Sequence, residues 1–174
     1  MQGLILAGGA STRFHGNKAR HQVDGDAMVS RVAQRMKEAG LEVAMVVRDR
    51  FLEDLGWPLW VEPRSNDRYP LRAMLWALEQ IPEGSGAVFA PCDMPFLTAT
   101  DFRALRTARA PAVAWDGENV QPLLVHLEKQ QLSLLRESVQ DSRSALRFVR
   151  GFERLSLERR HLRNINRPED LDSV

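Results

Sequence analysis

Residues 4–20 read LILAGGASTRFHGNKAR, and this stretch decides the fold and frames the search for a site. A short apolar run ends at Gly8 and Gly9, which is typical of a buried strand leaving a sheet. Glycines at this point let the main chain approach a ligand closely and expose its N–H groups. Arg13 and Lys18 follow, and together they offer a planar fork and a compact charge for phosphate oxygens.

This stretch matches neither of the two best-known phosphate loops. GxGxxG is absent, and GxxxxGK[ST] is absent because Gly9 and Gly16 are too far apart and Ala19 follows Lys18. The glycines alone are equally compatible with a tight strand-to-helix turn that has a solvated basic rim. The stretch is therefore a different nucleotide loop, or no nucleotide loop.

Beyond this stretch, apolar runs of strand length alternate with segments of helical periodicity. Such alternation implies crossover connections and a mostly parallel sheet that is covered on both faces. We therefore expect one domain spanning residues 1–174, a three-layer Rossmann-like α/β fold with a twisted sheet. Strands are predicted at 3–8, 41–47, 57–63, 86–91, 111–115, 122–127 and 152–157, and helices at 28–40, 71–81, 98–108, 130–138 and 142–150.

Composition excludes several classes of protein. The net charge is +1 and the chain has no dense basic run, which argues against a nucleic-acid binder. Cys92 is the single cysteine, so no internal disulfide or Cys-based zinc site is possible. The start of the chain has neither the charged region nor the long apolar stretch of a signal peptide, and no segment has the length of a membrane span. These features predict a cytoplasmic protein.

Asp93 directly follows the apolar run AVFAPC. Ligands of parallel sheets bind at the carboxyl ends of the strands, so this carboxylate is expected to face the glycine loop and to suit a hard dication such as Mg²⁺. The alternative is that Asp93 only caps a turn, since Asp is common before loops that contain proline. For Cys92 we expect packing in the core and no nucleophilic role.

Three motifs, in order, resemble those of the molybdenum cofactor guanylyltransferases, within the MobA-like nucleotidyltransferase superfamily. The first is LAGGASTRFHGNK at residues 6–18, the second is CDMP at residues 92–95, and the third is NINRPEDL at residues 164–171. Together they span nearly the whole chain. The resemblance implies the fold of the nucleotide-diphospho-sugar transferases and a nucleotidyl transfer assisted by Mg²⁺.

The resemblance also assigns roles to residues of the first two motifs. Arg13 and Lys18 would hold the phosphates, and Asp93 would hold Mg²⁺, so these three are the expected catalytic residues. Gly8 favours GTP, because cytidylyl relatives usually read LAAG where this chain has LAGG. The backbone of the loop would contact the nucleotide; its expected members are Leu6, Ala7, Gly8, Gly9 and Ser11.

The middle of the chain departs from the family pattern. A Gly-Pro-Leu-x-Gly turn is replaced by YPLRAM at residues 69–74. The family's acid that contacts the base aligns with Glu62, or with Pro63 if the loop is shifted, and its Asn falls near Arg48 or Asp49. Glu62 would accept hydrogen bonds from the N1–H and amino group of guanine. Its alternative role is a solvated strand end.

The resemblance implies that the second substrate, a pterin phosphate that accepts the nucleotidyl group, binds around the third motif. Asn164 and Asn166 would position a pterin phosphate, although asparagines before proline are also common in turns. Gln121 stands where relatives often have His, so it is either a pterin contact or simply the start of a strand.

The implied reaction joins GMP from GTP to the terminal phosphate of molybdenum-bound molybdopterin and releases pyrophosphate. Recipient molybdenum enzymes or their chaperones are the expected protein partners. Two alternatives remain open. One is a cytidylyltransferase or another nucleotidyltransferase acting on a phosphorylated acceptor, and the other is a non-catalytic nucleotide-binding module that delivers the cofactor. Presence of Arg13, Lys18 and Asp93 together argues against the second, because a decayed site usually loses one such residue.

Overall fold

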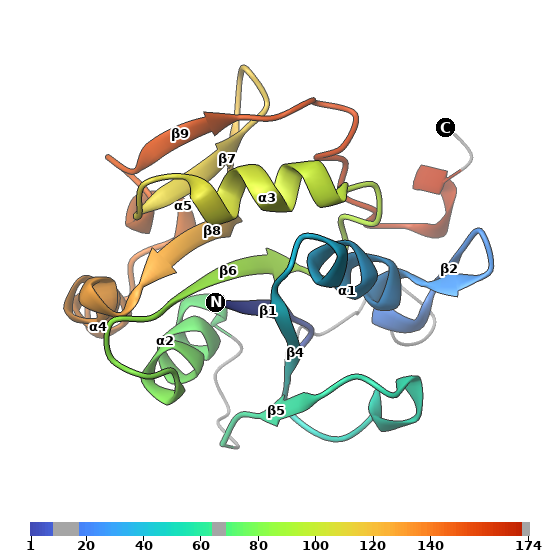
Figure 1. The fold of residues 1–174 in the computed structure, drawn as a ribbon, viewed down its shortest axis with the longest axis horizontal. Coiled ribbons are helices and arrows are strands. Elements are labelled where there is room, and N and C mark those ends of the chain that lie inside the picture. The colour runs from blue at the N-terminus through green and yellow to red at the C-terminus, as the bar shows by residue number, and fades with distance from the viewer. Residues whose placement is uncertain (9–17, 64–68, 172–174) are drawn as a thin grey trace.

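A seven-stranded sheet forms the middle layer of the molecule (Figure 1). The computed structural model describes residues 1–8, 18–63 and 69–171. The strand order is β5-β4-β1-β6-β8-β7-β9. The bounds of the strands are β1 Gln2–Leu6, β4 Glu42–Val47, β5 Leu59–Val61, β6 Gly86–Pro91, β7 Ala112–Trp115, β8 Val120–Glu128 and β9 Glu153–Ser156.

The sheet is mostly parallel, as the alternation of strands and helices predicts. Strands β5, β4, β1 and β6 are mutually parallel, and β7 pairs with β9 in parallel. β8 is antiparallel to both of its neighbours, β6 and β7. The sequence pattern does not predict this reversal, because an apolar run has the same composition in either direction.

Helices cover both faces of the sheet (Figure 1). One face packs on α1 and α3, and the other on α2, α4 and α5. Alternate residues of each buried strand go to opposite faces, so that Ile5 joins the first layer and Leu4 the second. The bounds of the helices are α1 Met28–Glu38, α2 Pro70–Gln80, α3 Ala99–Thr107, α4 Leu132–Gln140 and α5 Ala145–Phe148.

Local chemistry explains where the helices begin. Thr98 caps α3: its hydroxyl accepts from the N–H of Asp101, whose carboxylate accepts from the Thr98 N–H. Pro70 is the first residue of α2, where a missing N–H has no cost. The departure YPLRAM from the family pattern is thus the start of a helix. By contrast, the helix expected at 142–150 is only the single turn of α5.

A small hairpin lies outside the main sheet and was not predicted. β2 (Gln22–Val23) and β3 (Asp26–Ala27) pair antiparallel, and the turn between them places Asp24 and Gly25 at positive φ. This is the backbone that a two-residue hairpin loop prefers, and Asp-Gly is its usual sequence. The signal was therefore present in the sequence.

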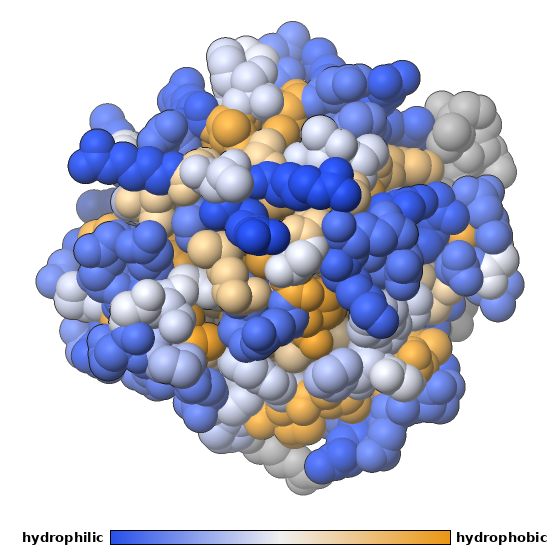
Figure 2. Space-filling view, viewed as in Figure 1, coloured by the Kyte–Doolittle hydropathy of each residue, from blue (hydrophilic) through white to orange (hydrophobic). Residues whose placement is uncertain are grey.

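The surface that Figure 2 shows is largely hydrophilic, with small apolar areas between the charged side chains. Among the described residues, the exposed large hydrophobics are Met1, Val61 and Leu146. No helix in the described part of the chain has both the length and the apolar character of a membrane span.

Candidate functional site

The candidate site lies where β5, β4, β1 and β6 end together at one edge of the sheet. After β1, the chain adds β4 and β5 on one side of that strand. It then returns to the opposite side of β1 to form β6, so the strand order reverses between β1 and β6. Ligands of open parallel sheets bind at such a reversal, beyond the carboxyl ends of the strands. The residues that follow these strands are therefore the ones to compare.

Lys18 and Asp93 meet at this point. Lys18 begins a 3₁₀ turn, Lys18–Arg20, and its Nζ lies 2.7 Å from Asp93 Oδ2. The same Nζ donates to Asn166 Oδ1 at 2.8 Å, and Asp93 O accepts from the N–H of Ile165 at 2.9 Å. Residues from all three sequence motifs are thereby brought into one cluster, although Asn166 is 148 positions from Lys18.

Asp93 has the properties of a metal ligand. Its side chain is 20% exposed, and its Oδ1 is buried without a hydrogen-bond partner among the described residues. A buried acceptor of this kind is costly unless a ligand completes it. No group of three or more His, Cys, Asp or Glu residues gathers in the described part of the chain. Asp93 therefore fits an ion such as Mg²⁺, which keeps several waters and takes one or two carboxylates plus substrate phosphates.

A cavity of about 410 Å³ opens in the C-terminal segment that contacts Lys18 and Asp93. Two arginines, two asparagines and one aspartate form its walls. Asp170 is fixed as an acceptor because the N–H groups of Asn166 and Arg167 donate to its carboxylate, and these bonds lower its pKa. The cavity is lined by Arg163, Asn164, Asn166, Arg167 and Asp170.

The backbone directly after β1 lies beside a second charged pair, Arg48 and Glu62. The N–H of Ala7 donates to Val46 O, which continues the β1–β4 ladder beyond Leu6. Gly8 then passes beside Glu62 and Arg48: a Cβ on Gly8 would lie 3.3 Å from Glu62 Oε1 and 3.3 Å from Arg48 Cγ. Arg48 Nε donates to Glu62 Oε1 at 3.1 Å. Leu6, Ala7 and Gly8 at the end of β1 and Glu62 at the end of β5 therefore lie on the two sides of β4, and Gly8 and Glu62 approach each other there.

Some expected site residues are not brought into this cluster. Gly9, Ser11 and Arg13 lie outside the described residues. Gln121 pairs with Ala114 within the β7–β8 ladder, and no contact joins it to Lys18, Asp93 or Asn166 in the described part of the chain. Asn164 lines the C-terminal cavity beside Asn166.

Arg20 points away from this cluster. Its guanidinium donates to the Asp54 carboxylate and to Phe51 O, and the bond from Arg20 lowers the pKa of Asp54. Asp49 does not contact Glu62 in the described part of the chain, and its carboxylate instead accepts from the N–H of Phe51. Of the two residues near the position where the family has Asn, only Arg48 contacts Glu62.

Cys92 packs against the core beside Asp93. Burial and, to a smaller extent, the neighbouring carboxylate of Asp93 raise the pKa of its thiol to about 12, although the charge of Lys18 opposes the shift. A thiol with this pKa is not ionised at neutral pH and is a poor nucleophile. This property agrees with the packing role expected from the sequence.

Two cationic residues of the candidate site, Arg163 and Arg167, were not predicted from the sequence. Both line the C-terminal cavity, and the Arg163 guanidinium also lies 5.6 Å from the ring centre of Phe96 and donates to Asp170 O at 3.0 Å. Their position in the sequence could have predicted them, because Arg163 and Arg167 flank the triplet Asn164-Ile165-Asn166. The family resemblance assigned roles in this segment to the two asparagines only.

The strand order, with helices on both faces of the sheet, defines a class of fold, the Rossmann-like architecture of the nucleotide-diphospho-sugar transferases. A solved relative, the molybdopterin-guanine dinucleotide biosynthesis protein A of Archaeoglobus fulgidus, superposes with a TM-score of 0.76 at 18% identity, over 99% of this chain and 96% of the other.

The chain belongs to the MobA-like NTP transferase domain family, whose model matches residues 3–160. It is 26% identical to the molybdenum cofactor guanylyltransferase of Desulfosudis oleivorans, covering 99% of this chain and 93% of the relative. A probable molybdenum cofactor guanylyltransferase of Synechococcus elongatus is 31% identical over 87% of this chain and 68% of its own length. The chain is therefore a nucleotidyltransferase.

Proposed function

We propose that this protein transfers GMP from GTP to the terminal phosphate of molybdenum-bound molybdopterin. The observation that supports this most is the convergence of Lys18, Asp93 and Asn166 at the point where the strand order reverses. Names of relatives at 26% and 31% identity favour this acceptor and this nucleotide. LAGG at residues 6–9 supports the choice of GTP over CTP.

The chemistry needs positioning and charge, and no nucleophile from the protein. An oxygen of the acceptor phosphate forms a bond to the α-phosphorus, the bond to the bridging oxygen breaks, and pyrophosphate leaves. Bound at Asp93, Mg²⁺ would supply neutralisation of the triphosphate charge. Lys18 would exchange its contact with Asp93 for the phosphate oxygens, and Arg13 and Ser11 would bind from the loop.

The acceptor would enter from the C-terminal side. Asn164 and Asn166 offer neutral donors and acceptors, and Arg163 and Arg167 supply positive charge in the cavity of about 410 Å³. The base would lie on the opposite side of Lys18, against Gly8 and Glu62. The triphosphate would then lie between the base and the acceptor, as in-line transfer requires.

A thermal melting panel tests the nucleotide. The protein is melted with Mg²⁺ and GTP, CTP, ATP or UTP in turn, alongside Asp93→Asn and the control Glu83→Gln, which changes an exposed carboxylate in the same way. A ligand at about 100 times its dissociation constant adds roughly 2.7 kcal/mol, a shift of about 5–10 °C for this length. We expect the shift with GTP, reduced in Asp93→Asn and retained in Glu83→Gln.

The other outcomes are informative. A shift with CTP alone keeps the chemistry and replaces the base. Nucleotide binding without pyrophosphate release, when molybdopterin is supplied, would support a non-catalytic module that delivers the cofactor. If none of the four nucleotides shifts the melting temperature in the presence of Mg²⁺, the proposed function is overturned.

A further inference from the structure

Arg48 and Glu62 are a nearly buried ion pair beside the candidate base position. Each residue comes directly after a strand, Arg48 after β4 and Glu62 after β5, and the N–H of Glu62 donates to Val47 O at 2.8 Å. Glu62 is 9% exposed, and Arg48 Nε lies 3.1 Å from its Oε1. A carboxylate at this depth needs a partner of opposite charge, which Arg48 supplies.

The two oxygens of Glu62 have different surroundings. Oε1 accepts from Arg48, whereas the described residues give Oε2 no hydrogen bond. Arg48 donates through Nε, the nitrogen nearest the aliphatic chain, so the contact holds one carboxylate oxygen of Glu62 and leaves the other available. Other polar bonds to the Glu62 carboxylate are absent from the part of the chain that the structure describes.

Gly8 shows how closely the pair approaches the main chain after β1. A Cβ at this position would come to 3.3 Å from both Glu62 Oε1 and Arg48 Cγ, which is tighter than most Cβ contacts. The absence of a side chain at Gly8 therefore lets the Arg48–Glu62 pair lie against the main chain at this residue. A planar group lying beside Gly8 would meet the carboxylate edge.

We propose that Arg48 is a positioning residue that determines nucleobase selection by directing Glu62 Oε2 toward the donor edge of the base. This inference rests on the proposed function, because it requires a nucleotide beside Gly8. A carboxylate oxygen only accepts, so it favours guanine, whose edge presents N1–H and an amino group. Hypoxanthine retains N1–H and lacks the amino group, and adenine turns a bare nitrogen acceptor toward the carboxylate.

The test compares dissociation constants for GTP, ITP, ATP and inorganic tripolyphosphate, all with Mg²⁺. A hydrogen bond to a charged oxygen corresponds to about 10- to 100-fold in affinity, so the wild type is expected to prefer GTP over ITP by at least about 10-fold. Arg48→Met and Glu62→Gln should each reduce this preference at least about 3-fold. Tripolyphosphate has no base, and its affinity should stay within about 2-fold.

Two further variants separate positioning from a purely structural role. Arg48→Lys keeps the charge without the Nε donor and should restore part of the preference for GTP. Arg50→Met removes an arginine two positions away whose exposed ion pair is with Glu53, and it should leave the preference unchanged. Arg48→Met combined with Glu62→Gln should lose no more preference than either single change, because both act on one contact.

Each result bears on a different claim. If Arg48→Met weakens GTP, ITP, ATP and tripolyphosphate equally, or leaves the ratio of GTP to ITP unchanged, Arg48 has no role in base selection. Should Arg48→Met fail to fold, the ratios measured for Arg48→Lys and Glu62→Gln decide in its place. Wild-type protein that binds neither the nucleotides nor tripolyphosphate would overturn the proposed function, and this inference with it.

Discussion

Cys92 and Asp93 are neighbours in the chain with opposite chemical properties. The thiol packs against the core, where burial raises its pKa to about 12, whereas the carboxylate bonds to Lys18 and keeps Oδ1 without a partner in the described residues. They differ because alternate positions at the end of a buried strand face different environments. One residue therefore packs and the next is available for a ligand.

His126 is the residue from which we expect the clearest dependence of stability on pH. Its ring is 2% exposed on β8, Nδ1 lies 3.0 Å from Ala108 O, and Nε2 is buried without a partner among the described residues. Burial lowers its pKa, while the bond to Ala108 and the charge of Glu128 oppose the shift. The native state therefore resists a second proton on this ring.

The sign of the effect follows from proton binding. Below the unfolded pKa of about 6.5, the unfolded chain protonates this histidine while the folded protein does not, so the free energy of unfolding falls as pH decreases toward the folded pKa. We expect His126→Gln to flatten this part of the profile, measured by urea unfolding between pH 7.5 and about 5. His21→Gln is the control. Parallel profiles for wild type and His126→Gln would contradict the prediction.

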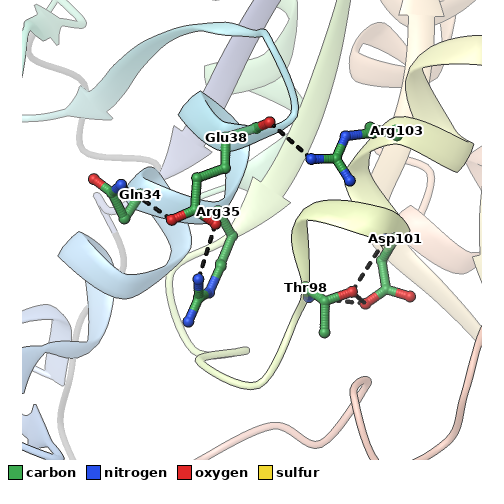
Figure 3. A network of polar contacts seen from close by, with 6 residues as sticks. All are labelled: Gln34, Arg35, Glu38, Thr98, Asp101 and Arg103. Atoms are coloured by element: carbon green, nitrogen blue, oxygen red, sulfur yellow. Dashed lines mark hydrogen bonds and ion pairs between the residues drawn. The ribbon is translucent and has the colours of Figure 1, made fainter.

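At the scale of elements, contacts at helix ends hold α1 and α3 together on the face of the sheet that both helices cover. Figure 3 shows Thr98 and Asp101 closing the start of α3, while Arg103 reaches the end of α1. The Arg103 guanidinium donates to Glu38 O at 3.1 Å, and Arg106 donates to Ala39 O at 2.7 Å. Because the last carbonyls of a helix have no partner within it, these arginines both satisfy them and fix α3 against α1.

Thr98→Ala should lower the free energy of unfolding by about 1 kcal/mol, because it removes the oxygen that accepts from Asp101 N–H. Thr107→Ala is the matched control: the same change in the last turn of α3, at an exposed threonine whose hydroxyl bonds to carbonyls of its own helix. We expect the control to be neutral or slightly stabilising. Equal losses from both variants in denaturant titrations would show that the cap contributes nothing specific.

Gly40→Ala should destabilise the protein by more than Gly56→Ala. Both glycines have positive φ, 78° and 73°, so each substitution has a backbone cost of about 1 kcal/mol. At Gly40 alone, the new Cβ would lie 2.6 Å from an Arg106 nitrogen, whereas no atom lies within 4 Å at Gly56. Arg106 would have to leave Ala39 O, which adds about 1 kcal/mol. Comparing the two unfolding midpoints measures this difference.

At the scale of the whole molecule, one lysine links the beginning, middle and end of the chain. Lys18 follows the first loop, Asp93 follows β6, and Asn166 lies in the C-terminal segment, yet a single ammonium contacts both of these partners. The ammonium lies where a cation would approach Asp93. If Asp93 holds Mg²⁺ as proposed, Lys18 and the ion would compete for this carboxylate in the absence of nucleotide.

This competition predicts opposite effects of one substitution. Lys18→Ala should strengthen binding of Mg²⁺ to the nucleotide-free protein by at least about 3-fold, because it removes a positive charge beside Asp93. The same change should weaken Mg²⁺–GTP by about 10-fold or more, since one charged contact to phosphate is lost. Isothermal titration measures both affinities.

Lys37→Ala, an exposed lysine on α1, is the control and should alter neither affinity. Weaker binding of both Mg²⁺ and Mg²⁺–GTP by Lys18→Ala would mean that Lys18 organises the site and does not compete for it.

Much of the fold follows from the sequence by itself. Apolar runs such as EVAMVV in β4 and GAVFAP in β6, separated by helical periodicity, predict a mostly parallel sheet covered on both faces. The position of Asp93 at a carboxyl end is also predicted, because the end of a strand depends on residues close together in the chain. The three family motifs, at residues 6–18, 92–95 and 164–171, indicate the nucleotidyltransferase class, because each motif is a short contiguous stretch of sequence.

Tertiary structure alone decided which distant groups meet. It reversed β8, directed Lys18 to Asp93 and Asn166, turned Arg20 toward Asp54, and paired Arg48 with Glu62. A strand's direction and a side chain's partner depend on packing across the sheet, and local patterns contain no information on it. The sequence therefore determined the elements and their class, while long-range packing determined the contacts that form the candidate site.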